Sequence, residues 1–334
     1  MLSDKAYYGV WTLPPLRFLY FNIAQSLAVF YGKNRPDYYL TEGLPLLLTT
    51  ALPFAMVGLW QALAQGSAQK ATNFSSSAAR DELLTSPRIL TGLAYTSLFM
   101  TLALSTISHK EVRFLYPILP FLHVLASRSL CTYFRPRTLS RRAVLALLLG
   151  ANLLISGYTS QVHQRGVIDV LDYLRYKHET QLQASKEVKT TTTVGFLMPC
   201  HSTPWRSHLV HSGIEAWALT CEPPLDVPLS ERHTYLDEAD RFYKNPGPAG
   251  WLVENMAPVN EGLRKNFRSG NIDIEDEGES KRKWPQNVVF FEQLEPVINE
   301  VLGRSRYREC WRGFNTHFHD DSRRVGDVIV WCRD

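Results

Sequence analysis

Four long apolar runs in the first 158 residues constrain this chain more than any other feature. Crossing the hydrocarbon core of a bilayer, about 30 Å thick, takes about 20 apolar residues in a helix. One such run could be a buried helix of a soluble core, but four in succession favour a polytopic α-helical membrane region at residues 43–158. The expected helices are residues 43–64, 88–108, 114–130 and 143–158.

An arginine-rich stretch between the last two runs gives this region an orientation. Residues 128–142 contain five arginines and no acidic residue, which is typical of a cytoplasmic loop. The opposite end of the third helix is then expected on the lumenal side, and so is everything after residue 158. By the same alternation, the glycosylation sequon at Asn73 is expected on the cytoplasmic side, where it would stay unmodified.

The segment before the first helix, residues 1–42, is rich in aromatic residues but holds only about 15 uncharged residues in a row. That is short for a span. We expect a lumenal segment lying at the membrane interface, with an amphipathic helix and with tyrosines in the aromatic belt. An additional span in this segment is the alternative, and it would invert the N-terminus.

Residues 159–334 have the composition of a water-soluble domain, with 22 Lys and Arg against 26 Asp and Glu. Apolar spacing predicts an amphipathic helix at 167–183, and β-branched runs predict strands at 191–199 and 325–332 and a strand running into a helix at 288–302. We therefore expect a lumenal α/β domain. The positive excess of the first half lies beside apolar runs, which argues against a nucleic-acid partner.

Four of the five cysteines fall in this expected domain: Cys200, Cys221, Cys310 and Cys332. An even number in an oxidising compartment predicts one or two disulfides, and four cysteines allow three pairings. Cys131 lies in the arginine-rich stretch, and we expect it to be a free thiol.

A charged block, residues 109–113, separates the second apolar run from the third. Ionisable groups at a membrane edge are costly and point to function. His109, Lys110 and Arg113 offer hydrogen-bond donors suited to gripping a phosphate, and Glu111 could orient them. The alternative is that these charges only mark the ends of two spans.

Two histidine-rich stretches raise the weaker alternative of a metal site. Neither has the spacing of a known zinc motif such as H-E-x-x-H, and we expect no metal. The chain also lacks the GxSxG, P-loop and GxGxxG motifs, so we expect no nucleotide or other cofactor. The residues of the two stretches are Cys200, His201, His208 and His211, and His317, His319, Asp320 and Asp321.

The charged block lies in "SHKEVRFLYPILP", which resembles the HKExRF signature of the dolichyl-phosphate-mannose-dependent mannosyltransferases of glycosyltransferase family 22. The upstream "FYGKNRPDYYLTEGLPLLL" looks like the aromatic lumenal loop of that family. Three later blocks, "GFLMPCHSTPW", "TYLDEADRFYKNP" and "ECWRGFNTHFHDD", are similar to the branch that adds the third, α1,2-linked mannose to the glycosylphosphatidylinositol (GPI) precursor.

The resemblance implies a GT-C membrane fold in the endoplasmic reticulum membrane. It implies dolichyl-phosphate mannose as the donor and the GPI precursor glycolipid as the acceptor, with inverting transfer in one displacement. His109, Lys110 and Arg113 would then bind the donor phosphate, and Glu111 would orient them. Family members are longer, so we expect the general base upstream of Met1 and interpret the chain as an N-terminally truncated, incomplete GT-C region. The alternatives are another family 22 enzyme, of N-glycan assembly, or a non-catalytic membrane fragment.

Overall fold

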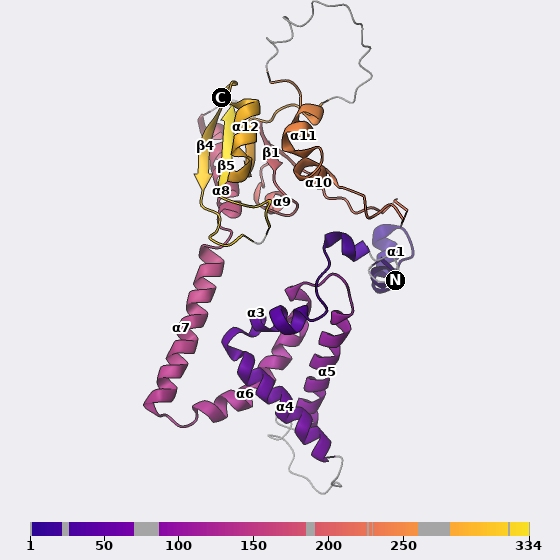
Figure 1. The fold of residues 1–334 in the computed structure, drawn as a ribbon, viewed down its shortest axis with the longest axis vertical. Coiled ribbons are helices and arrows are strands. Elements are labelled where there is room, and N and C mark those ends of the chain that lie inside the picture. Colours follow the sequence, from indigo (N-terminus) through magenta and orange to yellow (C-terminus); the bar gives the residue numbers. More distant parts are fainter. Residues whose placement is uncertain are drawn as a thin grey trace, which may run out of the picture. The chain divides into compact units, whose positions relative to one another are not determined.

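The computed structural model describes residues 2–21, 27–69, 87–184, 191–225, 227–228, 230–259, 281–319 and 321–333. The chain divides into two compact units (Figure 1). The first comprises residues 1–155 and 224–229, and the second comprises residues 156–223 and 230–334. The sequon at Asn73 lies outside the described residues.

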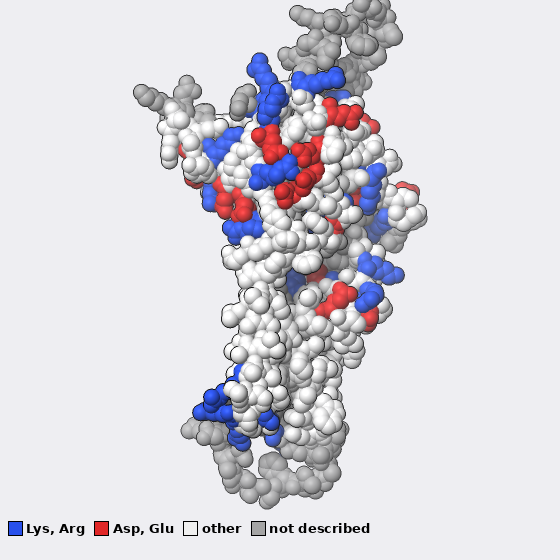
Figure 2. Space-filling view, turned by 60° about the vertical axis from the view of Figure 1, so that its left-hand side comes forward, with Lys and Arg blue, Asp and Glu red and all other residues white. Residues whose placement is uncertain are grey.

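The first unit is helical. Its long helices are α4 (Leu52–Gln69), α5 (Pro87–Ser105), α6 (Leu119–Phe134) and most of α7 (Leu139–Gln161), whose residues from 156 onward belong to the second unit. With the shorter turns before α4 and α6 they form four segments long and apolar enough to cross a membrane: Tyr39–Gln65, Pro87–Ser105, Val112–Phe134 and Leu139–Gln161. The prediction of four apolar helices is confirmed, and it is typical of a multi-pass membrane protein. Figure 2 shows helix surfaces almost free of charged side chains, with Lys and Arg side chains gathered near one end.

The first segment is interrupted rather than one continuous helix. A π-type turn (Tyr39–Gly43) leads into α3 (Leu44–Leu48), and a 3-10 turn (Thr49–Ala51) separates α3 from α4. Pro53 cannot donate a hydrogen bond to the turn before it, which accounts for the break. Thr49 there has a φ of 45°, and its hydroxyl donates to Asn152 Oδ1 of α7 over 2.9 Å.

Helices α4 and α6 approach each other closely because Gly58 has no side chain. A Cβ at that position would lie 2.0 Å from the Leu125 carbonyl oxygen of α6. The Ser129 hydroxyl of α6 donates to the Phe54 carbonyl over 2.7 Å, and the Thr91 hydroxyl of α5 donates to the Ala62 carbonyl over 2.9 Å. Small residues and hydroxyl bonds between helices are typical of membrane helix packing.

The N-terminal segment contains α1 (Leu2–Tyr8), α2 (Pro14–Leu19) and a 3-10 helix (Leu27–Tyr31). Each of these described elements is much shorter than a span. Residues 22–26, in the middle of the expected amphipathic helix, lie outside the described residues, so the interfacial helix stays a prediction.

The second unit is an α/β domain built on a five-stranded sheet of order β2-β1-β3-β5-β4. The strands are β1 (Thr192–Leu197), β2 (Ile214–Ala218), β3 (Asn287–Phe291), β4 (Tyr307–Gly313) and β5 (Val328–Arg333). Strands β2, β1 and β3 are parallel, whereas β5 is antiparallel to both β3 and β4. The expected α/β class is confirmed. The sheet is mixed, because it contains both parallel and antiparallel strands.

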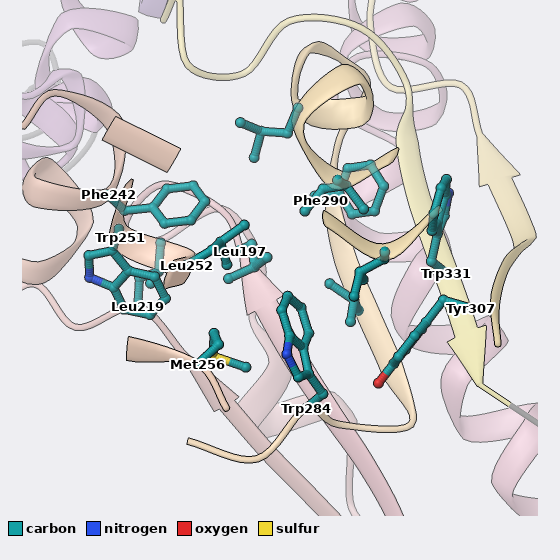
Figure 3. Close-up of a cluster of buried hydrophobic side chains, with 14 of the residues drawn as sticks. Leu197, Leu219, Phe242, Trp251, Leu252, Met256, Trp284, Phe290, Tyr307 and Trp331 are labelled. Atoms are coloured by element: carbon teal, nitrogen blue, oxygen red, sulfur yellow. The ribbon is translucent and has the colours of Figure 1, made fainter. Parts of the chain in front are cut away.

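Helices cover both faces of this sheet, which explains why its central strands are apolar throughout. One face packs on α8 (Gly166–Ala184) through Val170, Leu171 and Leu174. The other face carries the larger core, which includes Trp251, Phe290 and Trp331 (Figure 3). The helices of this unit besides α8 are α9 (Trp205–His208), α10 (Glu238–Tyr243), α11 (Gly247–Asn255) and α12 (Glu295–Leu302).

Two disulfides connect this unit, and they select one of the three possible pairings. Cys200 is bonded to Cys221 and Cys310 to Cys332. Cys131 is a free, exposed cysteine, as predicted.

Candidate functional site

The charged block begins in an irregular turn after α5, and its last two residues, Val112 and Arg113, begin the 3-10 helix Val112–Ile118 that leads into α6. Residues 106–111 belong to no helix or strand, so no regular hydrogen-bond ladder fixes the backbone around His109. A distant segment supplies the missing contacts. Asn34 donates its backbone N–H to the Ser108 carbonyl over 3.0 Å, and its side-chain Oδ1 accepts the Lys110 backbone N–H over 2.7 Å.

Glu111 connects the side chains of Arg113 and His109. Its carboxylate accepts from Arg113 Nη2 over 2.7 Å and lies 3.1 Å from His109 Nε2. The His109 Nδ1 atom lies 3.3 Å from the Gly32 carbonyl oxygen. Burial alone would raise the pKa of Glu111, but the hydrogen bonds and charges of Arg113 and His109 outweigh it and hold that pKa below its usual range. The low pKa favours the ionised carboxylate of Glu111.

The exposure of the three donors differs. The Arg113 side chain is 67% exposed and the His109 side chain 19% exposed, whereas Lys110 is only 4% exposed. The Lys110 ammonium donates to the Ile107 carbonyl over 2.7 Å. Among the described residues, no carboxylate lies within salt-bridge distance of that ammonium. An ammonium has three donors, so this group is suited to an anionic ligand.

An apolar cluster beneath the block holds it in place. Tyr39 is fully buried against Leu115, and a Cβ at Gly43 would come within 3.0 Å of the Tyr39 ring and 3.1 Å of Leu115. The Tyr-rich segment and the turn after the charged block are thus packed together, with Leu44, Leu48 and Ile118 in the same cluster.

The two histidine-rich stretches do not form a metal site among the described residues. Cys200 is engaged in a disulfide, His211 lies 2.8 Å from Glu179, and His317 lies 3.1 Å from the Tyr158 hydroxyl. The one cluster of metal-binding residue types found in the described ranges is Cys200, Cys221 and Asp237, whose sulfurs are bonded to each other. Asp320 lies outside the described residues.

The sequence comparisons decide the family. The model of the Alg9-like mannosyltransferase family matches residues 1–210, which include the whole charged block. The chain belongs to this family.

Curated relatives match nearly the whole chain. It is 45% identical to GPI mannosyltransferase 3 of Aspergillus fumigatus, with 99% of this chain and 44% of the relative covered. It is 46% identical to GPI mannosyltransferase 3 of Emericella nidulans, with 99% and 50% covered, and 33% identical to mouse GPI alpha-1,2-mannosyltransferase 3, with 98% and 49% covered. The chain thus spans about half the length of the curated relatives it matches. No solved structure matches it significantly.

Sequence reasoning missed the contribution of Asn34 and Gly32. It identified the segment around them only as an aromatic loop, and these two residues lie more than seventy positions before the block that they hold. No local pattern indicates such a contact. The roles assigned to His109, Lys110, Glu111 and Arg113 stay predictions.

Proposed function

We propose that this protein transfers mannose from dolichyl-phosphate mannose to a GPI precursor, adding the third, α1,2-linked mannose in the endoplasmic reticulum. The observation that carries the proposal is the buried Lys110 ammonium, which has no carboxylate partner among the described residues. Buried charges are normally paired, and a lipid-linked phosphate would supply the missing anion. The relatives named GPI mannosyltransferase 3 support the choice of acceptor.

The chemistry places negative charge where these donors lie. An acceptor mannose hydroxyl attacks the anomeric carbon of the donor, and the bond from that carbon to the phosphate oxygen breaks. Dolichyl phosphate leaves with the electron pair, and its charge grows as the bond lengthens. Cations fixed before the reaction stabilise such a leaving group without reorganisation at the moment of transfer.

Each side chain of the block then has a separate task. Lys110 contributes a point charge from a desolvated position, and Arg113 contributes a planar fork able to hold two phosphate oxygens. Glu111 fixes the Arg113 guanidinium and the His109 ring. Because the pKa of Glu111 is held low, this carboxylate is a poor proton acceptor. The proposal therefore assigns the general base to none of these four residues.

The proposed setting is lumenal. The arginines of residues 128–142 favour a cytoplasmic position for the connection between α6 and α7. The charged block precedes α6 at its other end, and the disulfides of the second unit agree with an oxidising compartment.

Complementation of cells that lack the third GPI mannose tests the proposal. The 334 residues are expressed alone and as a replacement for the matching segment of the Aspergillus fumigatus relative. We expect the chimera to restore GPI-anchored proteins at the cell surface. Arg113→Ala in the chimera should lower mannose transfer in microsomes by well over tenfold, since tenfold corresponds to about 1.4 kcal/mol of barrier.

Arg137→Ala is the matched control, because Arg137 is an exposed arginine of the 128–142 stretch. It should leave transfer unchanged. Equal mannose transfer by the Arg113→Ala and parent chimeras would show that Arg113 does not bind the donor phosphate. A chimera that is correctly inserted but adds no third mannose would refute the proposed reaction.

A further inference from the structure

The short loop after β4, residues 314–319, is fixed beside the last turn of the membrane-length helix α7. Three contacts within the second unit hold it there. The Tyr158 hydroxyl lies 3.1 Å from His317 Nδ1, His163 Nδ1 lies 2.8 Å from the Thr316 hydroxyl, and the Arg165 backbone N–H donates to the Asn315 carbonyl over 3.1 Å. Figure 1 shows the chain after β4 running past this end of α7.

The loop is anchored by buried residues and presents apolar ones to the outside. Asn315 is 2% exposed and Thr316 7% exposed, whereas Phe314 is 45% exposed and Phe318 68% exposed. The Phe318 ring lies 6.0 Å from the Tyr158 ring, and the Phe314 ring lies 4.7 Å from the His317 ring. Two large aromatic side chains are thus held on the surface by a rigid support.

We propose that this loop is a membrane anchor, with Phe314 and Phe318 inserted at the boundary between headgroups and acyl chains. We infer a lipid partner from α7, whose membrane-length window is strongly apolar and has no buried residue. A helix of that kind is surrounded by lipid or by other membrane helices. Tyr158 lies in its last turn, where a span of this length reaches the interface.

The loop has the composition of an interfacial element. Aromatic side chains are enriched at the membrane–water boundary, and amphipathic elements bury their apolar face about 5–10 Å into it. The exposed His317 and His319 are polar groups suited to the headgroup level. The second unit would therefore be attached to the bilayer at two points, the end of α7 and this loop, which restricts its rotation about the helix.

Fluorescence quenching in lipid nanodiscs tests the anchor. The full chain carrying Cys131→Ser, which removes the free thiol, receives either Phe318→Cys or Val253→Cys and is labelled with an environment-sensitive fluorophore. Val253 is the matched control because it is 70% exposed on α11, an element that does not include the proposed anchor. The nanodiscs contain phosphatidylcholine with a spin label near the headgroup or near the chain end.

We expect the label at position 318 to show blue-shifted emission and to lose most of its fluorescence to the headgroup-proximal spin label, with weaker quenching by the chain-end label. The label at position 253 should keep the emission of a water-exposed group. A label at 318 that behaves like the one at 253 would overturn the proposal, whether both are quenched or neither is. The readout does not involve mannose transfer and stands apart from the proposed reaction.

Discussion

Replacing Lys110 by Met separates the proposed ligand-binding role from a structural role. Met has a similar length and no charge, so it can occupy the same buried position. The substitution removes the hydrogen bond from the Lys110 ammonium to the Ile107 carbonyl. It also removes the ammonium of a residue that is 4% exposed, a group with no carboxylate partner among the described residues.

These two effects on folding stability have opposite signs and similar size. A hydrogen bond made by a charged group contributes about 1.5–3 kcal/mol. Burying an ion costs several kcal/mol when no partner repays it. We therefore expect the free energy of unfolding to change by less than about 2 kcal/mol, in either direction. Loss of one preorganised donor at a developing negative charge costs much more, about 10²–10³-fold in turnover.

The assay measures both quantities on the same protein. Mannose transfer from dolichyl-phosphate mannose is followed in microsomes that contain the chimera, and the thermal midpoint is measured after extraction in detergent. The Lys283→Met control, at an exposed lysine of the second unit, should change neither mannose transfer nor the thermal midpoint. A Lys110→Met protein with unchanged transfer would refute the role in binding phosphate. A large drop in the midpoint together with lost transfer would show that Lys110 is a structural residue.

Three further predictions concern the supporting fold. Gly58→Leu should lower the thermal midpoint in detergent through about 1–3 kcal/mol of overpacking against the α6 backbone, whereas Gly92→Leu should be tolerated because a Cβ there meets nothing within 4 Å. Replacing both Cys310 and Cys332 by Ser should cost about 3 kcal/mol of unfolding free energy, because the sequence separation is 22, and a denaturant titration of the second unit's tryptophan fluorescence measures it. Burial lowers the pKa of His178, so the unfolded chain takes up the proton first. Stability should then fall as pH drops below about 6.5, and less so in His178→Gln.

Elements with a continuous apolar run could be predicted from the sequence. Helix α7 is long and apolar enough to cross a membrane, and β3 and most of β5 are buried, so each contains a continuous apolar run. The edge strands β2 and β4 were not predicted. Strand β4 carries three charged residues, Arg308, Glu309 and Arg312, and edge strands commonly carry charges that prevent pairing with another chain.

The break before α4 was not predicted either. Pro53 indicates a helix without a complete set of hydrogen bonds, but the sequence does not say whether the helix bends or stops. The answer depends on Asn152, which donates from its side-chain amide to the Thr50 hydroxyl over 2.7 Å. Asn152, about a hundred positions away in the sequence, thus provides hydrogen-bond partners for the Thr49 and Thr50 hydroxyls at the break.

The geometry of the charged block also depends on distant residues that the sequence does not reveal, and this geometry matters for the proposed function. The residues that bear charge are adjacent in sequence, so a short motif reveals them. Their geometry is set by Asn34, which holds the backbone on both sides of His109, and by Gly32, whose carbonyl contacts the His109 ring. A turn without its own hydrogen-bond ladder would sample many conformations, and cations that move lose their advantage over water in stabilising a leaving phosphate. Under the proposed function, the segment from Gly32 to Asn34 is therefore as necessary to phosphate binding as the charges themselves, although it contacts the block only through amide and carbonyl groups.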